Sequence, residues 1–297
     1  MQSILIVANV NIVLFLRLKS QAVLYLLAMF VCVPACSATT VILVVTRSGM
    51  VMGVDGKINR VCTDASAPCI GDSDPIRKAF LVQKRFAVAA LGLQRADILA
   101  ADGKPLFVYD FQTWLEQIED RLPLDVTVSE LSWIVKREYK KPFGGLERAI
   151  RDRIVTHEDP NLIPRYIVVG YETGVANAYS IKADLDWVHP VARTPVVAHL
   201  FPARGERVDY GLRILGHQSA LNHFCDPATS VNRQISQSFH QLARFCSGND
   251  LSLMEARSLI VELLNVQAKH DHDEVRPPYR VITIRKPETV RPYGNAP

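Results

Sequence analysis

The sequence lacks the features that would identify a nucleic-acid-binding protein or a repeat protein. Its 34 basic and 30 acidic residues leave a net charge of only +4 in 297 residues, an excess too small to indicate a phosphate-backbone partner. It contains no internal repeat, low-complexity tract or clear interdomain linker. None of its six cysteines forms a C-x-x-C pair, which argues against a zinc ribbon. We therefore expect a globular protein with no nucleic-acid partner.

The first 38 residues have the form of a secretion signal. Two apolar runs flank a short basic segment, and the second run is too short to span a bilayer comfortably. Small residues at Cys36 and Ala38 provide a cleavage site after Ala38. We predict a signal peptide over residues 1–38 and a secreted or periplasmic location. Two alternatives stay open: a retained membrane anchor, and lipidation of Cys36, which would leave the Thr39 nitrogen inside a peptide bond.

Two of the six cysteines lie in this leader, so cleavage would leave Cys62, Cys69, Cys225 and Cys246. An even number of cysteines in an exported chain is compatible with two disulfides. We expect pairing between neighbours, Cys62–Cys69 and Cys225–Cys246, although spacing alone does not fix the connectivity.

The hydrophobic pattern predicts groups of strands and groups of helices in succession. Strands are predicted at 39–46, 50–54, 78–83, 86–93, 165–170, 175–181, 195–200, 211–215 and 280–285. Helices are predicted at 111–122, 127–139, 146–154, 230–245 and 252–268, and 55–75 is predicted to be a loop. This grouping favours an α+β fold over alternating βαβ units. We expect one domain over 39–290, followed by a flexible tail, 291–297.

Four residues at the ends of predicted strands suggest a shared site. Thr39 would open the mature chain, Asp55 closes the second apolar run, and Lys78 opens the third. Gly92 closes the fourth run, fourteen residues after Lys78. Each residue also has an ordinary structural interpretation, as a strand residue, a turn residue, a solvated strand edge or a bulge. Their joint order and spacing favour the shared site.

This order resembles the start of a mature proteasome β-type subunit. The matching features are the double threonine Thr39-Thr40, an apolar strand, a glycine turn, a second apolar strand ending at Asp55, the lysine strand of Lys78 and the glycine-ended strand of Gly92. The likeness covers roughly residues 39–125 and 250–285 and is faint between 140 and 250. The loop between Asp55 and Lys78 departs from the family because it is longer and contains two cysteines.

The resemblance implies an N-terminal-nucleophile hydrolase with a four-layer αββα sandwich that cleaves a peptide or small amide bond and needs no cofactor or metal. Thr39 would attack through its hydroxyl, and its own free α-amino group, with a pKa near ~7.7–8.0, would accept the proton. Lys78 would lower the pKa of that amine and stabilise the threonine oxygen as it becomes anionic. Asp55 would hold Lys78, and the Gly92 N–H would be the oxyanion donor.

The family's later serine and aspartate have only loose counterparts here, Ser219 and either Asp271 or Asp273, and we assign them no role. The segment Arg276–Tyr279 replaces the family's serine-glycine-glycine. This replacement supports an alternative, a catalytically inactive assembly subunit of the same fold. Thr40 is a rival nucleophile if cleavage falls one residue later.

Partners beyond the substrate are left open. A homo-oligomer is compatible with the sequence, and Leu131, Trp133 and Ile134 are candidates for its contact surface. A membrane is expected as a partner only if the leader is retained or Cys36 is lipidated. Two clusters, residues 270–274 and His217 with His223 and Cys225, contain metal-ligand residue types. We interpret both as ordinary loop, surface or core residues.

Overall fold

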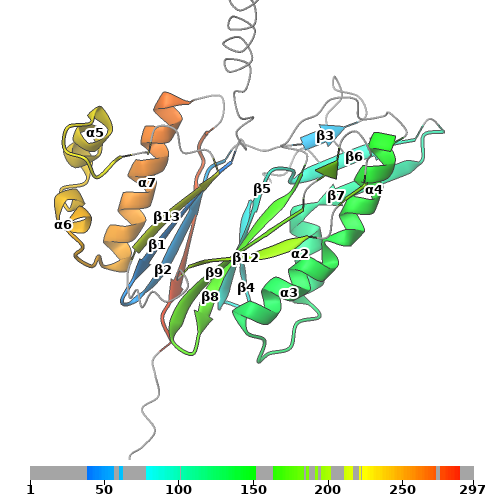
Figure 1. Cartoon of the computed structure of the whole chain (residues 1–297), viewed down its shortest axis with the longest axis horizontal. Coiled ribbons are helices and arrows are strands. Elements are labelled where there is room, and N and C mark those ends of the chain that lie inside the picture. Colours follow the sequence, from blue (N-terminus) through cyan, green and yellow to red (C-terminus); the bar gives the residue numbers. More distant parts are fainter. Residues whose placement is uncertain are drawn as a thin grey trace, which may run out of the picture. The chain divides into compact units, whose positions relative to one another are not determined.

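Groups of strands and groups of helices follow one another along the chain, and the strands of the larger sheets are antiparallel (Figure 1). The protein therefore belongs to the α+β class. The computed structural model describes residues 39–56, 60–62, 78–100, 102–151, 163–183, 185–186, 191–192, 195–201, 211–216, 221, 223–271 and 275–287. All of these belong to one compact unit, Ser37–Pro297. The predicted signal peptide, Cys69, His217, Ser219, Asp273 and the predicted tail lie outside the described residues.

The strands are β1 Thr40–Thr46, β2 Gly49–Val54, β3 Arg60–Cys62, β4 Ala79–Val82, β5 Phe86–Leu91, β6 Arg95–Leu99, β7 Pro105–Asp110, β8 Arg165–Glu172, β9 Val175–Lys182, β10 Leu185–Asp186, β11 Val191–Ala192, β12 Val196–Phe201, β13 Gly211–Gly216 and β14 Arg280–Arg285. The helices are α2 Phe111–Glu119, α3 Val128–Glu138, α4 Lys140–Arg151, α5 Ser230–Ser238, α6 Leu242–Cys246 and α7 Leu253–His270.

Two larger sheets form the centre of the described structure. One has the strand order β13-β1-β2-β14, and the other has the order β12-β9-β8-β5-β4. A three-stranded sheet, β3-β6-β7, and a two-stranded pair, β10-β11, complete the strands. Neighbours in both larger sheets are antiparallel.

Alternate residues of the central strands enter different cores. In β1, Val41 and Leu43 pack in a core shared with residues of the five-stranded sheet, whereas Ile42 and Val44 pack with α5 and α7. In β5, alternate residues likewise divide between that shared core and a third core with α2, α3 and α4. A strand has a period of two, so a strand buried on both faces shows a continuous apolar run. This explains why the sequence pattern located these strands correctly.

Glycine at position 53 allows α7 to lie close against β2. A Cβ atom at Gly53 would stand 2.1 Å from Cγ2 of Ile260, and Leu264 of the same helix also borders this position. A capping box fixes the residue at which α7 begins. The Ser252 side chain accepts a hydrogen bond from the Glu255 N–H, and the Glu255 side chain accepts one from the Ser252 N–H.

The structure corrects several sequence predictions. The predicted loop 55–75 contains the short strand β3, which pairs in parallel with β6. The β6–β7 hairpin was not predicted. The helix predicted at 230–245 is two helices, α5 and α6, since Phe239 leaves the helical conformation. Leu131, a candidate for an oligomer surface, is fully buried in the core, whereas Trp133 is 55% exposed.

The predicted disulfide between Cys225 and Cys246 is present. It joins the turn before α5 to the end of α6, and it closes a loop with a sequence separation of 21 residues. The other predicted pairing cannot be followed because Cys69 is outside the described residues. In the described part of the chain, no helix is long and apolar enough to cross a membrane.

Substitution of Gly53 by alanine tests the contact between α7 and β2. We expect Gly53→Ala to lower the free energy of unfolding by about 1–3 kcal/mol, because the added methyl group forces Ile260 and the helix backbone to move. The measurement is the midpoint of urea unfolding. The matched control is Gly144→Ala in α4, where a Cβ meets no atom within 4 Å and a helical alanine is expected to stabilise by about 0.5–1 kcal/mol. Equal midpoints for the two variants would contradict this account.

Candidate active site

The register of the β1–β2 hairpin places the start of β1 opposite Asp55. Thr46 pairs with Gly49 across a two-residue turn, and the register continues without a shift to the pair Val41 and Val54. One step further, the Asp55 N–H donates to the Thr40 carbonyl oxygen at 3.3 Å. The Thr40 N–H donates in turn to Oδ2 of Asp55 at 2.6 Å. The hairpin therefore fixes this carboxylate at the first residues of the strand.

Lys78 reaches the same point from the five-stranded sheet. Its backbone lies just before β4, where its carbonyl oxygen accepts a hydrogen bond from the Ala90 N–H of β5 at 2.8 Å. Its Nζ lies 2.8 Å from Oδ1 of Asp55 and 3.1 Å from Oγ1 of Thr39. The ammonium group thus connects residues that are 23 and 39 positions away in the sequence.

Burial makes these polar contacts strong. Thr39 and Thr40 are 0% exposed, Asp55 is 1% exposed, and Lys78 is 2% exposed. Removing two charges from water is costly, and their attraction compensates only when the geometry is good and the remaining polar atoms are hydrogen-bonded. Asp55 meets this condition because each of its carboxylate oxygens accepts a hydrogen bond. Such a pair is rarely tolerated for stability alone, so it is a candidate for function.

The direction of the hydrogen bond to Thr39 determines what Lys78 can do. Its ammonium donates to Oγ1, and a charged ammonium has donors but no acceptor. Lys78 therefore stabilises negative charge on the threonine oxygen and cannot accept the hydroxyl proton while it is charged. A separate base is required, and the nearest group that fits is the α-nitrogen of Thr39 itself, once it is a free amine.

Gly92 follows the end of β5, two residues after Ala90, which bonds the Lys78 backbone. It is buried and has φ of +79°. This left-handed conformation is unfavourable for residues with a Cβ atom, which explains glycine at this position. The described structure thus places Gly92 on the same strand end that anchors Lys78.

Segment Arg276–Tyr279 lies directly beside Asp55. The Gly56 N–H donates to the Arg276 carbonyl oxygen at 2.6 Å, and a Cβ at Gly56 would stand 2.6 Å from the Pro278 carbonyl oxygen. Burial, followed by the negative charges of Asp55 and Glu262, raises the pKa of the Tyr279 hydroxyl. This hydroxyl donates to the Leu264 carbonyl oxygen of α7 at 3.3 Å. Asp271 ends that helix, where its N–H donates to the Gln267 carbonyl oxygen.

The structure therefore brings Lys78 into hydrogen-bond contact with both Thr39 and Asp55, the arrangement that the resemblance implies. The sequence analysis missed the hydrogen bond from the Thr40 N–H, although a signal was available. Counting back from a two-residue turn at Arg47 and Ser48 places Thr40 opposite Asp55.

The described part of the chain contains no cluster of metal-ligand side chains. No group of three or more histidine, cysteine, aspartate or glutamate side chains there is close enough to hold a metal ion. Cys225 is engaged in the disulfide and cannot act as a thiolate ligand. Residues 217–220 and 272–274, which complete the two clusters noted in the sequence, lie outside the described residues.

No protein-family model matches the chain, and no curated protein matches it.

Removing the charge of Lys78 tests the buried ion pair. We expect Lys78→Met to lower the free energy of unfolding by about 3–5 kcal/mol, because it leaves the Asp55 carboxylate buried without its cation. The double variant Asp55→Asn with Lys78→Met removes both charges, and we expect it to recover part of this loss. Urea unfolding, monitored by circular dichroism, gives the free energy of unfolding of the unsubstituted protein, the single variant and the double variant.

The matched control is Lys104→Met, which removes the cation of the exposed pair with Asp102. Solvent screens that pair, and we expect little change in the unfolding midpoint. If Lys78→Met and Lys104→Met shift the midpoint equally, the Lys78–Asp55 pair does not contribute as described.

Proposed function

We propose that the protein is an exported threonine-type N-terminal-nucleophile hydrolase that cleaves peptide or small amide bonds. The observation that carries the proposal is the buried contact of the Lys78 ammonium with both Thr39 Oγ1, at 3.1 Å, and Asp55 Oδ1, at 2.8 Å. A threonine hydroxyl beside a buried cation has a lower cost of becoming an alkoxide than one in water.

Removal of residues 1–38 would supply the missing base. The freed α-amine accepts the hydroxyl proton as Oγ1 forms a bond to the substrate carbonyl carbon. The tetrahedral oxyanion accepts a hydrogen bond from the Gly92 N–H. Collapse breaks the C–N bond, and the leaving amine takes the proton from the Thr39 ammonium. Water then hydrolyses the acyl ester, with the same amine as base, and restores the hydroxyl.

The arrangement of cores supports a four-layer αββα sandwich as the fold behind this proposal. The two larger sheets share one core, and each contributes its other face to a core with helices. In such a sandwich, β1 and β4 belong to different sheets, and a site at their ends joins both. The disulfide between Cys225 and Cys246 supports an exported location, because disulfides persist in oxidising compartments.

A second candidate function is an inactive subunit of the same fold that serves in assembly. The segment 276–279 favours it, because the backbone of Arg276, Pro277 and Pro278 lies against Gly56, next to Asp55 in the chain. In an active relative, the segment at this place in the sequence would contain serine and glycine residues that support the α-amine of the terminal threonine. The two functions differ in whether the leader is removed before Thr39.

The decisive experiment combines the mature terminus with hydrolysis. We expect intact-mass and terminal-peptide spectra of the exported protein to show Thr39 as the first residue. We expect Thr39→Ala to lose at least about 10³-fold of the hydrolysis of a fluorogenic peptide-amide panel, because the nucleophilic hydroxyl is removed while the α-amine remains. Thr39→Ser should retain a measurable fraction, since it keeps both a hydroxyl and an α-amine.

Thr46→Ala is the matched control, because it removes a buried hydroxyl from the opposite end of the same strand. Urea unfolding of each variant shows whether the fold is retained. A processed terminus at Thr39 with equal activity in Thr39→Ala would refute the hydrolase. An intact leader and no hydrolysis in any variant would favour the assembly subunit.

A further inference from the structure

A row of directly opposite residues crosses part of the five-stranded sheet, starting next to Gly92. Leu91 of β5 pairs with Arg165 of β8, and Arg165 pairs with Lys182 of β9. Lys182 pairs in turn with Val196 of β12, the edge strand of this sheet. Neighbouring strands are about 4.8 Å apart. Two basic residues therefore stand one and two strands away from the end of β5.

The side chains of this row start from the sheet face that is directed at the four-stranded sheet. Leu91 packs in the core that the two larger sheets share, and directly opposite residues on antiparallel strands have side chains on one face. The Nε of Arg165 donates a hydrogen bond at 2.7 Å to Oγ of the buried Ser180. Ser180 lies two residues before Lys182 on β9 and shares its face. Arg165 and Lys182 are therefore directed toward the sheet that contains β1.

This row lies at the end of the sheets that contains the candidate active site. Ala90, next to Leu91, donates its N–H to the carbonyl oxygen of Lys78, and the Lys78 ammonium contacts Thr39. Strands β1 and β5 also approach each other, with Cα atoms within 8 Å. The backbone of Arg165 is therefore one strand away from the residues that anchor Lys78.

Exposure increases along the row. Leu91 is 1% exposed, Arg165 is partly buried, and Lys182 is exposed. Val196, at the edge strand, is 58% exposed. The row thus leads from solvent toward the interior beside Gly92, and its two basic side chains stand between these ends.

In the described part of the chain, neither Arg165 nor Lys182 has an acidic partner. Arg165 instead donates to a neutral hydroxyl, that of Ser180, and burial lowers the pKa of its guanidinium. Partial removal of a cation from water is costly when no anion compensates. The planar guanidinium binds a carboxylate through two parallel hydrogen bonds. A carboxylate ligand would therefore supply the missing negative charge.

We propose that Arg165 and Lys182 bind a carboxylate group of the substrate, so that the hydrolase prefers peptides or amides with an acidic group near the scissile bond. This inference rests on the proposed function of Thr39. Arg165 provides the paired hydrogen bonds, Ser180 fixes the orientation of its guanidinium, and Lys182 adds positive charge from the solvent side. The carboxylate belongs to an acidic side chain or to a chain terminus, since both offer the same chemistry.

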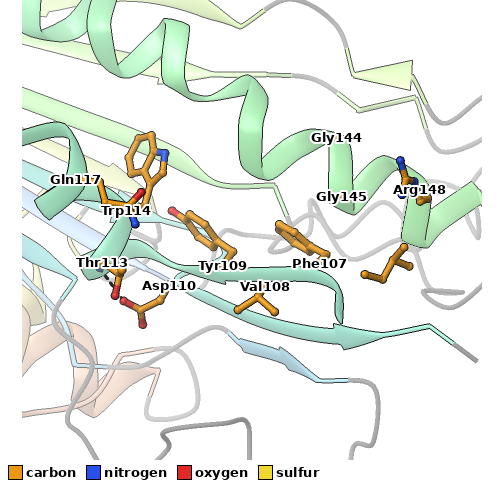
Figure 2. Close-up of a pocket in the computed structure, with 11 residues that line it drawn as sticks. Phe107, Val108, Tyr109, Asp110, Thr113, Trp114, Gln117, Gly144, Gly145 and Arg148 are labelled. Atoms are coloured by element: carbon orange, nitrogen blue, oxygen red, sulfur yellow. Dashed lines mark hydrogen bonds between the residues drawn. The ribbon is translucent and has the colours of Figure 1, made fainter. Parts of the chain in front are cut away.

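Arg148 of α4 provides a matched control for loss of a cation. It is exposed and has no ion-pair partner in the described part of the chain. Figure 2 shows it beside a cavity between β7, α2 and α4, and no residue of the row lines that cavity. Its helix packs through Leu146 and Ala149 in the core on the other face of the five-stranded sheet. Removal of this charge therefore leaves the contacts of the row unchanged.

Calorimetric titration of the exported protein with Thr39→Ala measures binding without turnover. The first probe, acetyl-alanyl-glutamyl-alanine amide, has only a side-chain carboxylate. The second, acetyl-alanyl-glutaminyl-alanine, has only a terminal carboxylate, and its amide, the third, has neither. We expect at least one acidic probe to bind about tenfold or more tightly than the neutral probe, because the neutral probe lacks the charge-assisted contacts. The tighter acidic probe identifies the source of the carboxylate.

Substitutions locate the carboxylate. Arg165→Gln should lower the affinity of the preferred acidic probe to that of the neutral probe, whereas Arg148→Gln should leave their ratio unchanged. Ser180→Ala keeps both cations and should reduce the ratio only in part. Lys182→Gln, at an exposed position, should reduce it about threefold, because solvent screens this charge. Urea unfolding shows whether each variant is folded, and the comparison of probes needs no variant in the row.

Kinetics with Thr39 intact test the preference during hydrolysis. Internally quenched peptides have glutamate or glutamine at each position in turn, and a free or an amidated carboxyl terminus. We expect kcat/KM of the best acidic peptide to exceed that of its neutral counterpart about tenfold or more. Arg165→Gln should bring this ratio close to one, and Arg148→Gln should not change it.

Several outcomes would overturn the carboxylate site. They are absence of saturable binding, equal affinity for the three tripeptides, and equal effects of Arg165→Gln and Arg148→Gln. Hydrolysis that depends on Thr39 but shows no acidic preference would refute the carboxylate site and retain the hydrolase. Carboxylate binding that depends on Arg165, in a processed protein that hydrolyses no peptide, would refute the hydrolase and retain the binding site.

Discussion

The contact between the Lys78 ammonium and the Asp55 carboxylate is the constraint on which the candidate site depends. The two residues come from different sheets, so the contact exists only if both sheets are folded and correctly registered. The remaining oxygen of Asp55 is occupied by the Thr40 N–H, which holds the carboxylate at one orientation. Lys78 is thereby held against Thr39 Oγ1, and in the proposed hydrolase this order would exist before substrate binds. Pre-organisation of this kind avoids rearrangement of charged groups during reaction.

The same region explains why one sequence can suggest both an enzyme and a non-catalytic relative. The lysine, aspartate and threonine contacts depend on the strands, which are rigid and buried. The features that distinguish this chain, such as segment 276–279 against Gly56, belong to connections between strands and helices. Connections vary more freely than the sheets they join. In the proposal made above, the strand contacts support the hydrolase and the connection 276–279 supports the assembly subunit.

Much of the fold could be predicted from the sequence because its central strands are buried on both faces and read as unbroken apolar runs. The contacts of Lys78 with Thr39 and Asp55 were expected from the resemblance to a proteasome β-type subunit, because no local pattern shows that the ends of strands in two different sheets meet. The β6–β7 hairpin was missed despite the Asp102-Gly103 dipeptide, a strong turn signal, with Gly103 at φ of +77°. The pairing of β3 with β6 joins Cys62 to Asp97 across a long separation, and no local pattern encodes such a pairing.

For the hydrolase proposed above, the hydrogen bond from Thr40 to Asp55 would make the position of the leader cut important. A cut after Ala38 leaves the Thr40 nitrogen as a neutral amide, and Asp55 then balances a single cation. A cut one bond later would convert that nitrogen into an ammonium 2.6 Å from the carboxylate. This second cation would compete with Lys78 for the same negative charge, and the same cut would remove Thr39 and the hydroxyl to which Lys78 donates. In the proposed hydrolase, the peptide bond that is cut would thus set the charge balance of the whole site.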